Sequence, residues 1–190
     1  MDNNIINYDK QILEMMSNPS WWIDKQKKRK IDLLRSARKV YRQSSISKKM
    51  GSLLLWQQVI EQFLKEIIEL SVFYIKAEIW PSRVNIKVDF DRKTFGQIIA
   101  DYENFSIDFK NKQNIREKLK LVNKNRNEIV HKIFNIDDLV QLEKYFEINF
   151  EEYENLLTLL LDHYSEVCYY LEDLKKRVDW DDFLEEMEYE

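Results

Sequence analysis

Glycine and proline are scarce in this chain, whose 190 residues include only Gly51, Gly96, Pro19 and Pro81 of these two types. A protein with many β-strands needs many tight turns, and such turns draw heavily on glycine and proline. Their scarcity disfavours a multi-stranded β-fold and indicates long helices joined by few connections. We therefore predict an all-α protein folded as an up-and-down helical bundle.

Cysteine is also scarce, and the single Cys168 excludes a disulfide within the chain. Its apolar neighbours predict a buried thiol. The first residues lack the basic region and apolar run of a secretory signal, and no apolar stretch approaches the roughly 20 residues that cross a bilayer. We therefore expect a cytoplasmic protein with no membrane partner.

The net charge of −4 conceals a strong gradient along the chain. Residues 1–50 carry 12 Lys and Arg against 5 Asp and Glu, whereas residues 137–190 carry 4 against 18. The basic part attracts polyanions and the acidic part repels them. This is not the uniformly basic profile of a dedicated DNA-binding domain. It permits nucleic-acid contact at a local site, and it also permits head-to-tail association of two copies.

Apolar residues recur at steps of three and four along most of the chain, which is the pattern of amphipathic helices. We predict helices over about 5–16, 21–43, 50–79, 94–105, 111–134 and 150–178, with a short helix capped by Asp137 and Asp138 before the last of them. Residues 84–90 alternate with period two, but no partner strand is visible, so a loop is predicted there.

These elements group into three parts. We expect residues 1–49 to form basic N-terminal helices that pack on a bundle of residues 50–178, and residues 179–190 to form an acidic C-terminal tail.

An arginine interrupts the apolar register of the helix predicted over 111–134. One face of this helix carries Ile115, Leu119, Val122, Ile129 and Ile133, and Arg126 occupies the position that the series leaves open. A guanidinium in a core-facing position is costly unless it is paired or faces a wet cavity. Arg126 is therefore either a structural ion-pair partner or a binding group at a cleft or interface.

Two further polar residues follow Arg126. Asn127 and His131 are four residues apart and project from the same side of the helix, whereas Arg126 and His131 lie about 140° apart around an ideal helix. One helix does not easily aim both at one point. Two copies related by a two-fold axis would each contribute to a shared groove, which predicts a homodimer.

The pattern Arg126-Asn127-x-x-x-His131 resembles the Arg-x4–6-His motif of the HEPN superfamily, in its common Arg-Asn-x-x-x-His form. The stretch from Asp91 to Ile99, which contains Thr94 and Gly96, is similar to the Thr-x-Gly-x-Leu/Ile element often found before that motif. The resemblance covers about residues 51–171. Ile133 stands where the toxin subgroup silenced by nucleotidylation carries a tyrosine, so that mode of control is not implied.

Membership of this superfamily implies a small helical bundle, frequently dimeric, that in many cases is a metal-independent endoribonuclease of a prokaryotic toxin–antitoxin, phage-defence or stress system. It implies that His131 acts as general acid or base, that Arg126 holds the phosphate, and that Asn127 orients the phosphate or the imidazole. Lys124 and Lys132 would guide the RNA backbone. The implied partners are RNA and an antitoxin or another defence protein.

Two other functions stay open beside the nuclease: a HEPN-like module that binds RNA or nucleotide without cleaving it, and a helical adaptor whose motif is an interface ion-pair network. His163, the second histidine, is interpreted as a packed or surface residue. Two histidines and one cysteine make no zinc pattern, and two glycines make no phosphate loop, so no cofactor is expected. Glu61, Glu66 and Glu69 are interpreted as solvent-facing, with support of a site as the alternative.

Overall fold

The computed structural model of the protein describes residues 10, 12–18, 27–42, 45–80, 82, 84–132 and 139–177. Within these residues the chain is almost entirely helical and holds no strand, which confirms the predicted all-α fold. After a helical segment at residues 12–17, the elements in chain order are α2 (Lys27–Tyr41), α3 (Ile46–Glu78), α4 (Phe95–Phe105), α5 (Lys112–Lys132) and α6 (Leu139–Arg177).

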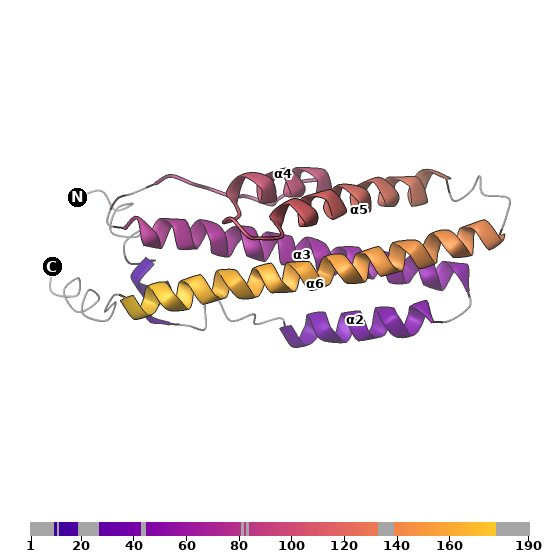
Figure 1. Cartoon of the computed structure of the whole chain (residues 1–190), viewed down its shortest axis with the longest axis horizontal. Coiled ribbons are helices and arrows are strands. Elements are labelled where there is room, and N and C mark those ends of the chain that lie inside the picture. Colours follow the sequence, from indigo (N-terminus) through magenta and orange to yellow (C-terminus); the bar gives the residue numbers. More distant parts are fainter. Residues whose placement is uncertain are drawn as a thin grey trace.

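The long helices α3 and α6 run side by side through the molecule, and the shorter helices pack around them (Figure 1). α2 lies against α3, α5 lies against α6, and α4 bridges α3 and α5. α3 carries buried apolar side chains on more than one side, since Val59 and Ile68 are both buried and lie about 180° apart around the helix. This helix is therefore the centre of the core. The end of α5 and the beginnings of α3 and α6 lie at the same end of the bundle (Figure 1).

Two predicted boundaries are wrong. α6 is one continuous helix of 39 residues from Leu139, where we predicted a short helix and then a break before Phe150. Its buried positions Phe146, Asn149 and Tyr153 continue the spacing of three and four across the predicted break, so the helix has a core-facing side throughout. α3 begins at Ile46, before the predicted start near residue 50, and Ser45 takes the extended N-cap conformation.

Other predictions fall outside the described residues. These include the start of the first helix, residues 21–26 of the second, the caps Asp137 and Asp138, and the acidic tail at residues 179–190.

α2 is attached to the bundle by polar contacts as well as by its apolar side. Lys30 is buried and pairs with Glu66 of α3, and the Ser52 hydroxyl of α3 donates a hydrogen bond to the Ala37 carbonyl at 2.6 Å. At the other end, Arg38 Nε lies 2.7 Å from Glu154 Oε1 of α6. The interpretation of Glu66 as solvent-facing is therefore wrong, because this carboxylate neutralises a buried ammonium group.

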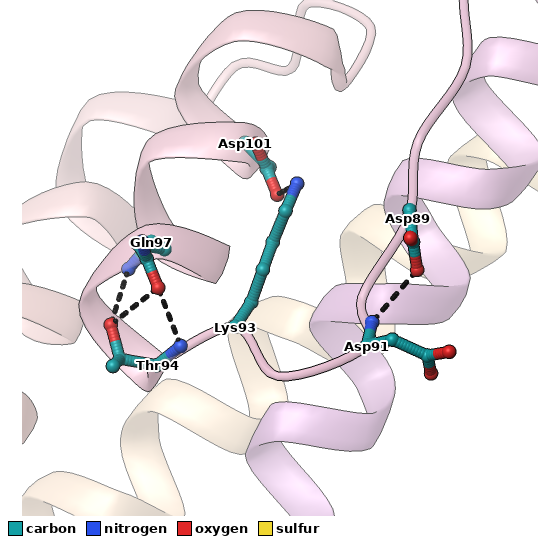
Figure 2. Close-up of polar contacts among 6 residues, drawn as sticks. All are labelled: Asp89, Asp91, Lys93, Thr94, Gln97 and Asp101. Carbon is teal, nitrogen blue, oxygen red and sulfur yellow. Dashed lines mark hydrogen bonds and ion pairs between the residues drawn. The ribbon is translucent and has the colours of Figure 1, made fainter.

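The element that resembles Thr-x-Gly-x-Leu/Ile forms the N-terminus of α4 (Figure 2). The Thr94 hydroxyl accepts a hydrogen bond from the Gln97 N–H, and the Gln97 side chain accepts one from the Thr94 N–H at 2.7 Å. This reciprocal capping box satisfies two N–H groups that the first turn leaves without helical partners. Residues 84–90, which precede it, are a coil without strand pairing, as predicted.

His163 is a core residue, which agrees with its interpretation as a packed side chain. Its ring is fully buried, its Nδ1 atom lies 2.8 Å from the Tyr102 hydroxyl, and it stacks on Phe109 at 4.6 Å between ring centroids. Cys168, four positions after Tyr164 on the same helix, is only partly buried. The prediction of a buried thiol is therefore wrong, because the side chain lies at the margin of the apolar face of α6.

Burial of His163 makes stability depend on pH. Burial, and to a lesser extent the charge of Lys112, lower the pKa of His163 to about 4, whereas an unfolded histidine titrates near about 6.5. The unfolded chain therefore binds the proton first as pH falls, and the stabilisation present above about pH 6.5 declines towards pH 4. The full loss is about 3 kcal/mol, with roughly 2 kcal/mol of it by pH 5.

Urea unfolding at pH 7.5 and pH 5.0 measures this loss. His163→Gln keeps a polar group for Tyr102 but does not titrate, so this variant should lose much less stability between the two pH values. An equal loss in the wild type and the variant would assign the effect to other groups.

Candidate functional site in the C-terminal half of α5

α5 carries Arg126 into the bundle in the register that the sequence predicts. Ile115, Leu119 and Val122 have no exposed surface, and Arg126 follows on the same side in a partly buried position. The helical backbone continues to Lys132. The side chains of Ile129, Val130, His131 and Lys132 lie outside the described part of the structure.

The guanidinium of Arg126 is held by an amide of the central helix. With the Gln57 amide oxygen turned towards Arg126, this oxygen accepts hydrogen bonds from Arg126 Nη1 at 3.2 Å and Arg126 Nε at 3.1 Å. Gln57 is only 5% exposed. Two donors on one edge of the guanidinium are thus occupied, and its position and orientation are fixed from α3.

A small cavity of about 10 Å³ adjoins this contact, enough for roughly one water molecule. Its walls are Met50, Leu53, Leu54 and Gln57 of α3, Arg126, and Tyr153 of α6. Burial strongly raises the pKa of Tyr153, and the nearby Arg126 charge opposes that shift. Leu54 keeps 42% of its surface exposed, so one wall of the cavity lies next to solvent.

The charge of Arg126 is not neutralised by a carboxylate among the described residues, since none of their ion pairs includes it. A neutral amide fixes the guanidinium but leaves its positive charge available. A partly buried cation in this state is stabilised by an anion or by water. Of the two roles that the sequence left open, the ion-pair role is therefore not seen within the described residues.

A hydrogen-bond network next to Arg126 joins α5 to α6. The Tyr145 hydroxyl donates to the Asn125 carbonyl at 3.1 Å, the Asn149 amide donates to the Tyr145 carbonyl at 2.7 Å, and the side chains of Asn125 and Asn149 bond to each other. Asn149 is 1% exposed. This network sets the position of the α5 backbone immediately before the motif.

The remaining predicted site residues lie on the same helix as Arg126. Lys124 and Asn127 are exposed. By helical register, position 131 lies about 40° from Asn127 and about 140° from Arg126 around the α5 axis. His131 and Lys132 belong to α5, but their side chains are not among those described.

Sequence reasoning missed Gln57 and Tyr153 at this site. Gln57 carries a signal that could have found it, because it is a polar residue between Trp56 and Ile60 on the apolar central helix α3. A buried amide on a core helix needs a polar partner, and Arg126 is the polar residue in a core-facing register elsewhere. The sequence does not mark Tyr153 in a comparable way, since an aromatic residue within the apolar face of a helix is usually a core residue.

Comparison with known proteins returned no matching family model, no matching curated protein and no matching solved structure. Among the described helices, none combines the length and apolar character that a membrane span requires.

Proposed function

We propose that the protein is a metal-independent endoribonuclease of the HEPN type, acting in a prokaryotic defence, toxin–antitoxin or stress system. One observation carries the proposal: Arg126 is fixed by a neutral amide, without a carboxylate partner among the described residues, directly before the exposed Asn127. An oriented cation without a counter-charge is what binding of a phosphate group requires.

The proposed reaction uses three residues of α5. His131 takes the proton from the ribose 2′-OH or gives one to the leaving 5′-oxygen, because imidazole exchanges protons near neutral pH. Arg126 stabilises the charge on the phosphorane-like transition state through the guanidinium edge that Gln57 leaves open. Asn127 orients the phosphate or the imidazole, and Lys124 and Lys132 hold the RNA backbone.

A second copy of the chain completes the proposed site. About 140° of rotation separates Arg126 from position 131 on α5, so one helix presents them to different sides. Two α5 helices facing each other across a two-fold axis would bring Arg126 of one copy near position 131 of the other. The active form is accordingly proposed to be a homodimer, with cytoplasmic RNA as substrate.

Incubation of the purified protein with mixed RNA in EDTA tests the reaction class. Cleavage should persist in EDTA and leave products that end in a 2′,3′-cyclic phosphate, because the 2′-OH is the nucleophile. An oligonucleotide with 2′-deoxyribose at the cleaved position should remain intact, while its all-ribose counterpart is cut. Activity that disappears with EDTA and returns with Mg²⁺, or cleavage of DNA, would assign a different chemistry.

The contact of Arg126 with Gln57 also supports a second candidate function. The polar contacts of α5 also suit a module that binds RNA or nucleotide without cleaving it, or a helical adaptor. In that case Arg126→Ala would weaken RNA binding, or would lower only stability, and no RNA product would form under any condition.

A further inference from the structure

The outward face of α2 carries a row of positive charge that the proposed reaction does not use. Arg35, Lys39 and Arg42, called the basic stripe below, are exposed. The Arg42 N–H still donates to the Arg38 carbonyl at 3.3 Å, so the helical register extends to this residue. Steps of four and three residues place the three side chains within about 60° around the axis and within about 10 Å along it. α2 holds one acidic residue, Asp32.

Neighbouring carboxylates leave most of the charge of the basic stripe available. Arg35 lies 3.6 Å from Asp32, but the two side chains are 74% and 56% exposed, and a surface pair of this kind contributes little free energy. Lys39 and Arg42 form no ion pair with any residue that the structure describes. Three like charges on one face attract a polyanion.

Helix stability accounts for only part of this positive charge. Lys39 lies in the last turn of α2, where the helix dipole favours a cation. Lys48 adds a further exposed charge in the first turn of α3, which contains no acidic residue. The dipole disfavours a cation at that position. The charge of Lys48 therefore does not serve the helix that carries it, and an external anion would give it a role.

The positive charge leads towards the proposed catalytic residues. The end of α2 and the beginning of α3 lie at the end of the bundle where α5 ends (Figure 1). Lys48 precedes Met50 by two residues, and Met50 lines the cavity beside Arg126. α2 and α5 lie on opposite sides of the pair formed by α3 and α6 (Figure 1), so a ligand that joins them bends round the end of the bundle. A single strand can make this bend, whereas a duplex with a persistence length of about 150 base pairs resists it.

The packing of α2 favours a nucleic acid over a membrane as the polyanion. A basic amphipathic helix binds an anionic membrane by inserting its apolar face among the lipids. The apolar face of α2 packs on α3 instead, where Ala37 is fully buried and its carbonyl accepts a hydrogen bond from Ser52. A stacked nucleic-acid strand carries one charge per about 3.4 Å of its axis. The basic stripe is therefore long enough to contact three phosphates.

We propose that the basic stripe and Lys48 bind the sugar–phosphate backbone of single-stranded RNA and lead the strand to Arg126. The identity of the polyanion rests on the proposed function. The contacts go to phosphate, so they hold the strand without selecting its sequence. The stripe contributes to affinity and takes no part in the chemical step, so its loss should raise KM and leave kcat unchanged.

Fluorescence anisotropy on the full chain tests the proposal with a labelled 2′-O-methyl oligonucleotide of mixed sequence, which cannot be cleaved by attack of a 2′-OH. The triple variant Arg35→Gln, Lys39→Gln, Arg42→Gln should bind this probe about 100-fold more weakly than the wild type at about 0.1 M salt. The slope of log Kd against log salt concentration should fall by about 2, because each phosphate contact of a single strand contributes about 0.7. The single variant Lys39→Gln should bind about fivefold more weakly for the same reason.

The matched control removes the same net charge elsewhere. Lys87, Lys110 and Lys176 are exposed and lie outside α2 and α3, so the triple glutamine variant at these positions should bind the probe as the wild type does. Equal weakening in both triple variants would reduce the effect to net charge and overturn the proposal, and so would unchanged binding in the stripe variant. Binding of phosphatidylserine vesicles without binding of the oligonucleotide would assign the face to a membrane and also overturn it.

Failure of the nuclease proposal would give a different result. If all-ribose RNA stayed intact but binding depended on the basic stripe, the reaction would be removed and the RNA-binding face would stand. The thermal midpoint shows whether each variant is folded. Glutamine is a good helix former and the three positions are exposed, so the stripe variant should fold. If its midpoint is lowered, the single variant Lys39→Gln decides the result.

Discussion

His131→Ala is expected to lower the rate of RNA cleavage by about 10²–10⁴ while leaving the helical content unchanged. This range is the usual contribution of general acid–base catalysis by a positioned side chain. The measurement is the single-turnover rate on a labelled RNA in EDTA, with circular dichroism as the check on folding. Alanine is a good helix former, so the substitution should not interrupt α5.

The chain supplies its own matched control, because it has only two histidines. His163 is fully buried beside Tyr102 and Phe109, and His163→Gln should therefore lower stability and leave the cleavage rate of the folded protein unchanged. If both variants lost cleavage to the same extent, the loss would result from lower stability of the fold. The proposed role of His131 in proton transfer would then have to be withdrawn.

The helices of this protein follow from local sequence patterns, and so most of them could be predicted. The scarcity of glycine and proline, and apolar residues at steps of three and four, are sufficient to predict α3 and α5 to within a few residues. The capping box of α4 is also a local pattern, because Thr94 and Gln97 lie within four consecutive residues of the sequence. Polar residues such as Glu147 and Asn149 interrupt the apolar run before Phe150, although Asn149 is buried and the core-facing side of α6 continues there.

Pairings between distant residues could not be predicted in the same way. The apolar register of α5 identifies Arg126 as unusual, but its partner Gln57 lies 69 residues earlier, and only the packing of α5 against the bundle brings them together. In the sequence, nothing distinguishes Glu66 from an ordinary solvent-facing glutamate. Only the packing of α2 on α3 brings Lys30 next to it.

Arg126→Ala is expected to reduce cleavage by about 10²–10³, the usual loss when a group that stabilises transition-state charge is removed. Arg126→Lys should recover only part of that loss, because an ammonium group keeps the charge but cannot present two parallel donors while bonded to Gln57. Arg116→Ala is the matched control. It removes an arginine from the same helix, one that is paired with Glu103 at 2.6 Å, and should leave cleavage unchanged.

Mixing the two inactive variants then distinguishes a shared site from a site within one chain. If Arg126 of one copy acts with His131 of the other, a dimer of one Arg126→Ala chain and one His131→Ala chain has one intact site and one doubly altered site. Random exchange makes half of the dimers mixed, so an equimolar mixture should recover about a quarter of the wild-type activity through the two-fold arrangement. If both residues act within one chain, every site lacks one of them, and the mixture stays as inactive as its components. That second result would keep the chemistry but remove the dimeric site, and it would require α5 to bend between Arg126 and His131 so that both could reach one phosphate.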